Sequence, residues 1–405
     1  MASVAERAPG ARRPRVPAIR LEGVTKAYTG QVEPAVRDLS FDVAEGETAV
    51  LVGPSGCGKT TTLRLINRLI TPDEGRIVVD GDDVSGAEPD ALRRRMGYVI
   101  QQIGLFPHMT VQENVATVPR MLGWSKARRG ERTDELLATV GLEPSAFRDR
   151  FPRELSGGQQ QRVGVARALA ADPPILLMDE PFGSVDPVVR ERLQDELLSL
   201  QRRLRKTILF VTHDIDEAVK MGDRIAVMDH GGRIEQYATP AQVLSRPASQ
   251  FVSEFVGPGA TLKALSLTRV GDLEPAECPV LGLSSDPAAI RAAIRRAGTE
   301  DALLVDDVGR PRCWVTVEEL ERRFDALGEA AIAAEATVRR SDDLRLALER
   351  MVSTRAGKAV VVDDAGACIG VVELAGVIAA VESLRSHASV TARGREVRPL
   401  SPVSD

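Results

Sequence analysis

The fold is decided by residues 48–60, which read TAVLVGPSGCGKT. The apolar run from Thr48 to Gly53 is typical of a strand that is buried on both faces of a parallel sheet. It ends in a glycine-rich turn, and the stretch TTTLRLINRLI, from Thr60 to Ile70, then carries apolar side chains at helical spacing. A strand, a glycine turn and a helix in this order predict that the chain begins with an α/β core.

The glycine turn matches the pattern G-x-x-x-x-G-K-[ST], which binds nucleotide phosphates when it stands between a strand and a helix. Its glycines let backbone N–H groups turn toward phosphate oxygens, and the helix N-terminus adds positive potential. Lys59 is expected to reach the β- and γ-phosphates, and the Thr60 hydroxyl to bind Mg²⁺. A glycine-rich turn with a chance lysine is the alternative, which the matched strand and helix disfavour. This P-loop predicts an ATP site that includes Gly53, Pro54, Ser55, Gly56, Cys57, Gly58, Lys59, Thr60 and Thr61.

Further apolar strands are expected beside the P-loop. The strand ILLMD, residues 175–179, would carry Asp179 to its carboxyl end, where the carboxylate holds Mg²⁺ through water while Glu180 faces an attacking water. The strand TILFVTH ends in His213, a residue type that is more often structural when it stands alone. Because several strands present a polar residue at the same edge, we expect His213 to act in the site. Another strand, RIAVMDHG, covers residues 224–231.

The composition is typical of a soluble globular protein, with 43% hydrophobic and 27% charged residues, and 405 residues suggest two or three domains. A net charge of -5 and 3% aromatic residues argue against nucleic acid as a partner. The 4 cysteines lie far apart, which favours unpaired thiols in a cytosolic protein over zinc sites. The N-terminus lacks the apolar core of a secretory signal, and no run approaches the ~20 apolar residues of a membrane span. Any membrane role is therefore expected to come through a partner.

The organisation of the chain follows from shifts in composition. Residues 1–18 are rich in Ala, Arg and Pro and are expected to be disordered, as are residues 387–405. Residues 100–165 have charged faces and little β character, which predicts a helical insertion into the α/β core. Composition shifts again after FVGPGATL, residues 255–262.

The remainder contains an internal repeat. ALLVDDVGRPRCWVT, residues 302–316, matches AVVVDDAGACIGVVE, residues 359–373, at a constant offset of 57. Each copy predicts a strand, a turn and a second strand, preceded by an amphipathic helix over 287–296 or 344–351. Neither copy can bury a core alone, so we expect the two to pack on one another. The paired acids are expected to be turn residues rather than metal ligands: Asp306, Asp307, Asp363 and Asp364.

These motifs, in their order, resemble the ATPase subunits of ABC transporters. After the P-loop come VIQQ (99–102), LSGGQ (155–159), ILLMDE, GSVD (183–186) and the strand that ends in His213. The resemblance covers about residues 19–257. It implies a P-loop NTPase core of the α/β class with a helical subdomain, followed by an α+β domain pair.

The resemblance implies that LSGGQ serves a second copy of the chain. Two subunits dimerise head to tail, and the signature turn, Ser156–Gln159, of one copy caps the γ-phosphate held by the P-loop of the other. Ser156, the amides of Gly157 and Gly158 and the following helix N-terminus suffice without a lysine, because Lys59 and Mg²⁺ already neutralise the phosphate. ATP then joins the two halves, and hydrolysis lets them part.

The same resemblance implies a role for each of several single residues. Gln101 is expected to touch Mg²⁺ and the attacking water, Glu180 to act as general base, and His213 to contact the γ-phosphate. Asp186 would lie at the dimer interface. Tyr28 stands where the family stacks an aromatic ring on adenine, although a strand-end tyrosine is also an ordinary edge residue.

Three longer stretches indicate which group of ABC ATPases the chain resembles: GCGKTTTLRLINRLI, YVIQQIGLFPHMTVQENVATVP and FVSEFVGPGATLKALSLTRV. With the C-terminal repeat, they are similar to importers of glycine betaine, proline, choline or carnitine, which are quaternary amines and osmoprotectants. The resemblance implies an ATP-hydrolysing translocase subunit, peripheral to the cytoplasmic face of the membrane, whose partners are permease subunits and a substrate-binding protein. The first alternative is another small polar cargo, such as an amino acid. The second is a soluble ABC protein of DNA repair or translation, which the single P-loop and single LSGGQ disfavour.

The repeat resembles a pair of CBS domains at residues 276–325 and 326–386, after a linker at 258–275. CBS pairs in general bind adenine nucleotides through Thr or Ser followed three residues later by Asp or Asn. The copies here carry Thr316 before Glu319 and, at the matching positions, Glu373 before Gly376. Simple AMP binding is therefore not expected. The resemblance leaves open an ionic-strength response, an adenine or cyclic dinucleotide effector, or a purely dimer-stabilising role.

Overall fold

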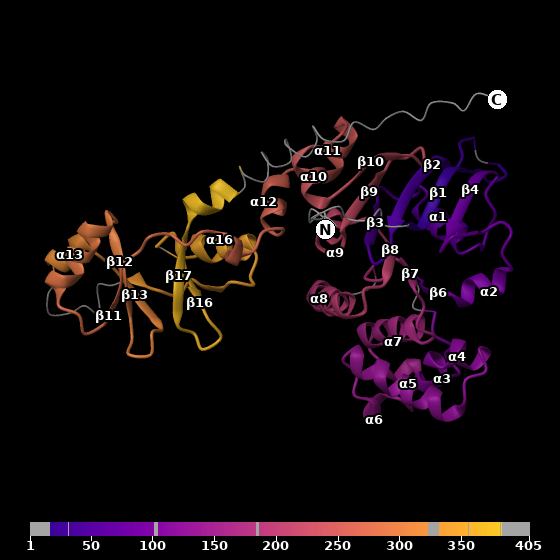
Figure 1. Cartoon of the computed structure of the whole chain (residues 1–405), viewed down its shortest axis with the longest axis horizontal. Coiled ribbons are helices and arrows are strands. Elements are labelled where there is room, and N and C mark those ends of the chain that lie inside the picture. The colour runs from indigo at the N-terminus through magenta and orange to yellow at the C-terminus, as the bar shows by residue number, and fades with distance from the viewer. Residues whose placement is uncertain are drawn as a thin grey trace, which may run out of the picture. The chain divides into compact units, whose positions relative to one another are not determined.

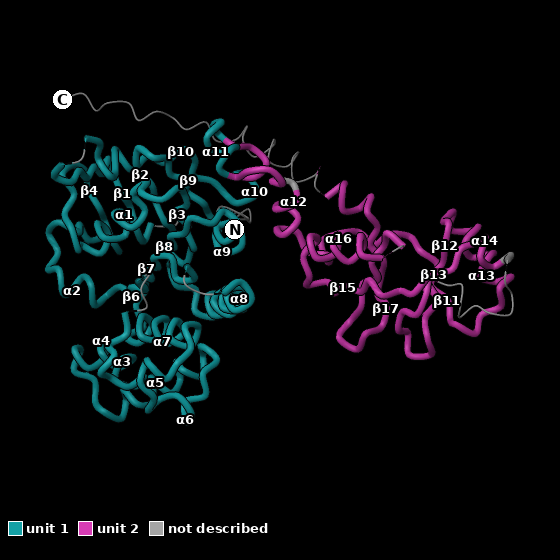
Figure 2. The backbone as a smooth tube through the Cα atoms, turned by 180° about the vertical axis from the view of Figure 1, so that it is seen from behind, with its two compact units in different colours: residues 1–243, 248–255 teal, residues 244–247, 256–405 magenta. Residues whose placement is uncertain are grey.

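The computed structural model describes residues 17–30, 32–100, 104–183, 186–322, 332–354, 356–380 and 382. The chain divides into two compact units, residues 1–243 with 248–255 and residues 244–247 with 256–405 (Figure 2). The first unit carries the P-loop and the signature turn, and the second carries the sequence repeat.

The core of the first unit is a six-stranded sheet in the order β10-β9-β3-β8-β7-β6 (Figure 1). Its strands are β3 (Thr48–Val52), β6 (Met96–Val99), β7 (Ile175–Asp179), β8 (Thr207–Thr212), β9 (Arg224–Met228) and β10 (Ile234–Ala238). Neighbouring strands are parallel except for the edge pair β9 and β10. Every residue of β3, β7 and β8 is buried, which explains their unbroken apolar sequences.

A second, antiparallel sheet has the order β2-β1-β4-β5. Its strands are β1 (Pro17–Lys26), β2 (Val36–Ala44), β4 (Glu74–Val79) and β5 (Asp82–Asp83). Helix α1 (Lys59–Ile66) buries Leu63, Leu65 and Ile66 in a core shared with residues of both sheets. The P-loop is thus fixed between a fully buried strand and a helix packed into the main core.

Helices form the rest of the first unit, and they confirm the helical insertion expected at residues 100–165. They are α2 (Pro89–Arg94), α3 (Val111–Val115), α4 (Thr117–Met121), α5 (Lys126–Thr139), α6 (Pro144–Phe147), the 3-10 turn η1 (Pro152–Glu154), α7 (Gly157–Leu169), α8 (Pro187–Leu204), α9 (Ile215–Met221), α10 (Pro240–Ser245) and α11 (Gln250–Val256). Figure 1 shows α3 to α7 gathered at one end of the unit, beyond β6 and β7.

Three element boundaries differ from the sequence prediction by two residues or more, and β8 ends at Thr212, one residue before His213. Strand β1 begins at Pro17, because Ala18 is buried and its carbonyl accepts the Asp80 N–H; residues 1–16 lie outside the described residues. Helix α1 ends at Ile66 instead of Ile70, since Arg68 adopts a left-handed φ of 48°. Strand β9 ends three residues before Gly231, because the Asp229 carboxylate accepts N–H groups of the following turn.

The second unit contains two sheets, in the orders β11-β12-β13-β14 and β15-β16-β17. Its elements are α12 (Ala260–Leu265), η2 (Val270–Asp272), β11 (Val280–Gly282), α13 (Pro287–Ala297), β12 (Asp301–Val305), β13 (Pro311–Thr316), α14 (Val317–Arg322), β14 (Ile332–Ala333), β15 (Thr337–Arg339), α16 (Leu344–Val352), β16 (Lys358–Val362) and β17 (Cys368–Glu373). Residues 374–380 form a further helix.

The predicted repeat is confirmed at the level of hydrogen-bond register. The pairing of β12 with β13, including its bulge, recurs 57 residues later between β16 and β17. The side chains of Asp306 and Asp363 accept N–H groups of their own turns, so both are turn residues as expected. The copies pack together through a shared core of Leu303, Trp314, Ala334, Val360 and Val371.

The expected domain boundaries inside this unit require two corrections. The stretch at 258–275, expected to be a linker, contains α12 and η2, whose Leu265 and Val270 are buried in the core of the second copy. Strand β14, which the boundary at 325/326 assigned to the second copy, pairs with β13 of the first. Residues 387–405, expected to be a disordered tail, lie outside the described residues.

Candidate functional site

The P-loop leaves β3, and two of its glycines, Gly53 and Gly58, cannot be replaced without collision. A Cβ on Gly53 would lie 2.4 Å from the Met228 carbonyl oxygen. Gly58 has a left-handed φ of +99°, and a Cβ there would lie 2.2 Å from the Ala35 carbonyl oxygen. The loop is therefore held on two sides by the backbone of neighbouring segments.

Lys59 lies at the centre of this loop and is only 6% exposed. Its ammonium group donates to the carbonyl oxygens of Gly53, at 2.7 Å, and Pro54, at 2.9 Å. Burial raises the pKa of the Cys57 thiol, whose Sγ lies 3.7 Å from Lys59 Nζ, so the thiol remains neutral near pH 7. The positive charge inside the loop is thus not offset by a thiolate.

The ends of the neighbouring strands meet at this loop. Val52 of β3 lies opposite Thr212 of β8, and Asp179 of β7 lies opposite Val211. The Thr60 hydroxyl donates to Asp179 Oδ1 at 3.0 Å. Burial raises the pKa of Asp179, which the Thr60 hydrogen bond partly counteracts. A hydroxyl and a buried carboxylate on adjacent elements are the oxygen donors that suit Mg²⁺, so the residues present fit this ion.

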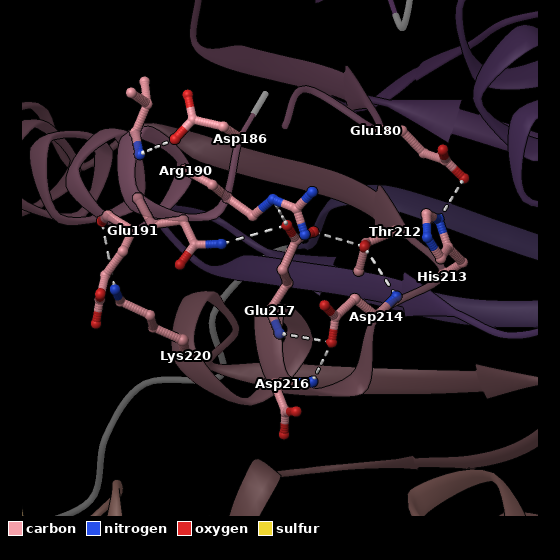
Figure 3. Close-up of polar contacts among 12 residues, drawn as sticks. Glu180, Asp186, Arg190, Glu191, Thr212, His213, Asp214, Asp216, Glu217 and Lys220 are labelled. Carbon is pink, nitrogen blue, oxygen red and sulfur yellow. Dashed lines mark hydrogen bonds and ion pairs between the residues drawn. The ribbon is translucent and has the colours of Figure 1, made fainter. Parts of the chain in front are cut away.

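Glu180 follows β7 in a left-handed conformation with a φ of 42°. Its N–H donates to the Val211 carbonyl oxygen at 2.9 Å, which anchors this conformation to β8. The side chain lies beside His213, with Oε1 3.2 Å from Nδ1 of the ring (Figure 3). The structure therefore brings the expected base into direct contact with the histidine that is expected to reach the γ-phosphate.

The signature turn forms the start of α7. Ser156 is the N-cap residue, and its Oγ accepts the Gln159 N–H while Gln159 Oε1 accepts the Ser156 N–H. Ser156 and Gly157 are exposed, and a Cβ on Gly157 would meet nothing within 4 Å. As an acceptor in this cap, the serine hydroxyl keeps its own hydrogen available for a phosphate oxygen.

Comparison with known proteins identifies the family. A family model described as ABC transporter matches residues 36–183. The osmoprotectant import ATP-binding protein OsmV of Salmonella typhimurium is 46% identical over 352 residues, which cover 86% of this chain and 92% of that protein. The chain belongs to the ABC transporter family of ATP-binding proteins.

Two further similarities extend this result. The glycine betaine/carnitine/choline transport ATP-binding protein OpuCA of Bacillus subtilis is 42% identical over 370 residues, 89% of this ABC ATPase and 95% of that protein. The dimeric ATP-binding cassette MJ0796, solved in a post-hydrolysis state with ADP and Pi, matches with a TM-score of 0.50 and 37% identity over 55% of this chain and 98% of that one. The expected family and P-loop NTPase fold are confirmed, and the CBS resemblance stays a prediction.

The remaining expected site residues of the ABC ATPase are placed less fully. Asp186 caps α8 by accepting the Val189 N–H at 3.1 Å. Gln101 lies outside the described residues. Tyr28 follows β1 in the segment that leads to Ala35, which contacts Gly58, and its stacking on adenine stays a prediction.

Sequence reasoning missed a buried polar cluster beside His213. Thr212, Gln194 and Glu217 are buried, and the Glu217 carboxylate joins the other two. The acids of THDIDEA resemble ordinary residues of an exposed first helical turn, so the sequence gives no signal that one of them points inward. The regular placement of Gln194 among the apolar residues Leu193 and Leu197 of α8 is the only hint.

In the second unit, the positions weighed for nucleotide binding are engaged within the chain. Thr316 and Glu319 cap α14 reciprocally, and Glu319 Oε2 accepts the Thr316 N–H at 2.8 Å. Lys358 forms ion pairs with Asp301, at 2.7 Å, and with Glu373, at 2.9 Å. The expectation against simple AMP binding stays a prediction.

Across the described ranges, none of the helices combines the length and the apolar character that a membrane span requires.

Proposed function

We propose that this ABC ATPase hydrolyses ATP to energise the import of a quaternary amine or osmoprotectant through a separate membrane permease. The observation that carries the proposal is the pairing of Glu180 with His213 at the same sheet edge as the P-loop and the Asp179–Thr60 pair. The printed functions of OsmV and OpuCA support the cargo class. The ATPase would lie peripherally at the cytoplasmic face of the membrane, with a substrate-binding protein delivering cargo to the permease.

The positions of these side chains support a separate role for each of them in ATP hydrolysis. Lys59, inside the P-loop, would bind the β- and γ-phosphates in place of the two carbonyl oxygens it now contacts. Glu180 would accept a proton from the attacking water, and His213 would hold the Glu180 carboxylate in position while reaching the γ-phosphate. Mg²⁺, held by Thr60 and Asp179 with Gln101, would neutralise charge on the phosphates.

The site would be completed by a second copy of the chain. The signature turn is exposed and locally satisfied, and its hydroxyl and the amides of Gly157 and Gly158 can face a phosphate bound by a partner subunit. Asp186, at the start of α8, would lie at the same interface. The dimeric state of MJ0796 with ADP and Pi supports this arrangement.

The shared site is tested by Glu180→Gln, which keeps the hydrogen-bonding shape and removes the base. We expect ATP hydrolysis to fall by on the order of 100-fold or more while ATP binding persists and a stable dimer forms. Adding Ser156→Arg to Glu180→Gln should abolish the ATP-dependent dimer, measured by size-exclusion chromatography with light scattering. ATP binding to the P-loop should remain.

The matched control is Ser145→Arg, which places the same charge on an exposed residue of the helical part. It should leave the dimer of the Glu180→Gln protein intact. Normal hydrolysis by Glu180→Gln would refute the assignment of the base, and a dimer unaffected by Ser156→Arg would refute the shared site.

The cargo class is tested by reconstituting the ABC ATPase with its permease and substrate-binding protein and measuring uptake of labelled betaine, choline, carnitine and proline. We expect ATP-dependent uptake of at least one of these compounds, abolished by Glu180→Gln. Uptake of an unrelated amino acid in their place would support the alternative cargo.

We also propose that the repeat, residues 276–386, is a CBS pair that regulates transport. Its two copies share a core and an ion-pair cluster at Lys358, so they can act as one rigid sensor. Truncation after residue 257 should leave hydrolysis intact and remove the dependence of transport on salt or on added adenine or cyclic dinucleotides. Transport that stays equally sensitive would leave the repeat a stabilising role alone.

A further inference from the structure

A buried carboxylate is hydrogen-bonded to the residue that precedes His213. Glu217 of α9 is 7% exposed, and its Oε2 accepts the hydroxyl of Thr212, the last residue of β8, at 2.6 Å. Its Oε1 accepts from Gln194 Nε2 of α8 at 3.3 Å, and Arg190 Nε lies 3.8 Å away (Figure 3). One carboxylate thus joins three elements: β8, α9 and α8.

Local structure does not explain this burial. Asp214, not Glu217, caps α9, since its side chain accepts the N–H groups of Asp216 and Glu217. Placing a carboxylate in the protein interior costs free energy unless hydrogen bonds compensate, and burial raises the pKa of Glu217 accordingly. The hydrogen bonds from Thr212 and Gln194 supply that compensation.

Of the elements that Glu217 joins, β8 leads to His213, and α8 packs against the helix of the signature turn. Thr212 immediately precedes His213, whose ring contacts Glu180. Helix α8 begins after the cap residue Asp186. It also packs against α7, the helix that follows the signature turn, since a Cβ on Gly158 would lie 2.9 Å from Val189 Cγ1. A shift of α8 would therefore reach His213 through Gln194, Glu217 and Thr212 in sequence.

We propose that Glu217 is a positioning residue for ATP hydrolysis, which ties the end of β8 to α8 and so sets the contact between His213 and Glu180. The inference rests on the roles proposed above for Glu180 and His213. Glu217 itself touches no reacting atom. Its carboxylate accepts the Thr212 hydroxyl, whose oxygen in turn accepts the Asp214 N–H at 3.0 Å, so the residues on both sides of His213 are held.

Removal of one donor should misplace the histidine without disturbing the P-loop. A buried carboxylate oxygen that loses its partner must find another or draw water, and either shifts the end of β8. Displacements of about 1 Å can lower a catalytic rate by on the order of 100-fold. Lys59 belongs to a different strand-to-helix connection, so the KM for ATP should change little.

The decisive experiment compares Thr212→Val, Thr212→Ser and Thr133→Val in the full chain. Thr133 is also buried, and its hydroxyl donates within α5, away from the site, so Thr133→Val is a matched loss of a buried hydroxyl. We expect Thr212→Val to lower kcat by roughly 10- to 100-fold with KM within about 2-fold, whereas Thr212→Ser and Thr133→Val stay near wild type. The thermal midpoint of Thr212→Val should fall further than that of Thr133→Val, because Thr212→Val also leaves Glu217 Oε2 and the Asp214 N–H without this partner.

A second pair of variants tests the carboxylate. Glu217→Gln keeps an acceptor for Thr212, and Gln194 can turn its amide to match, so kcat should stay within about 3-fold of wild type. Glu217→Ala should lower kcat as Thr212→Val does, and the double variant should be no slower than the worse single one. If Thr212→Val does not fold, Gln194→Ala applies the same test.

The outcomes separate this inference from the proposed function. His213→Ala serves as the reference for loss of the histidine. Thr212→Val with the kcat of Thr133→Val would overturn the inference if His213→Ala is slow, and the proposed function would stand. If His213→Ala also hydrolyses ATP normally, the roles assigned to the site fail as well.

Discussion

The P-loop and the signature turn both set a glycine-rich turn ahead of a helix, yet their surroundings differ. In the P-loop, side chains at Gly53 and Gly58 would collide with backbone oxygens of neighbouring segments, and Lys59 is 6% exposed. In the signature turn, Gly157 has open space around it and Ser156 is exposed. The first turn is enclosed by its own chain at Gly53 and Gly58, whereas the second is open to a partner at Ser156 and Gly157.

The N-termini of the helices that follow the two turns, α1 and α7, differ in the same way. Helix α1 begins after Gly58 without a side-chain cap, so its first N–H groups are available to a ligand. Helix α7 is capped by Ser156 within a reciprocal hydrogen-bond pair. The comparison teaches that similar sequences can serve opposite purposes: the P-loop is built around an anion, whereas the signature turn is stable alone and can be brought to one.

The largest difference between the two turns is expected when one glycine of each turn is replaced by alanine. Gly58→Ala forces a Cβ against the Ala35 carbonyl oxygen in a left-handed conformation, so ATP affinity should fall by on the order of 100-fold. Gly157→Ala meets no neighbour and should leave ATP affinity and the thermal midpoint of the isolated subunit unchanged. Equal losses at both sites, measured by fluorescent nucleotide titration and calorimetry, would contradict the contrast.

A smaller effect concerns stabilisation by nucleotide. ATP at about 100 times its Kd should stabilise a single binding site by ~2.7 kcal/mol. Lys59→Ala should remove most of the resulting rise in thermal midpoint, whereas Ser156→Ala should keep it, because only the P-loop binds nucleotide within one subunit. Loss of the rise in thermal midpoint in Ser156→Ala, measured in a dilute, monomeric sample, would contradict the view that only the P-loop binds nucleotide within one subunit.

The cap of α7 should contribute a modest amount to folding. Ser156→Ala removes the oxygen that accepts the Gln159 N–H, and the loss of such a cap costs about 1 kcal/mol. Ser156→Asn, which can still cap, should recover most of the loss in urea unfolding. A cost absent from Ser156→Ala would show that the capping box does not stabilise the isolated subunit.

The smallest effect concerns the pH dependence of stability at Asp179, beside the P-loop. Burial raises the pKa of Asp179 above its ordinary 3.8, so the folded state binds the proton more tightly than the unfolded state. Stability is then lost as pH rises from 3.8 through the raised pKa, and Asp179→Asn removes that loss. The variant should gain more stability over wild type at pH 8 than at pH 4, in the absence of nucleotide. A gain that is the same at both pH values would show that Asp179 carries no such cost.

Much of the fold could be predicted because it depends on local patterns. Unbroken apolar runs identified β3, β7 and β8, and the 57-residue offset identified the paired strands of the repeat. Predictions failed where burial by distant segments decides the outcome. The stretch 258–275 is predicted to be a linker, yet Leu265 and Val270 are buried in the core of the second copy.

The sequence by itself determined the phosphate-binding chemistry, since glycines, Lys59 and the strand ending in Asp179 and Glu180 specify it at fixed spacing. Only the tertiary structure decided that Glu180 meets His213, from another strand, and that Glu217 turns inward to hold Thr212. Spacing along the chain encodes contacts within one turn or one helix. Contacts between strands that lie far apart in sequence depend on how the sheet is ordered and on which polar groups find partners when water is excluded.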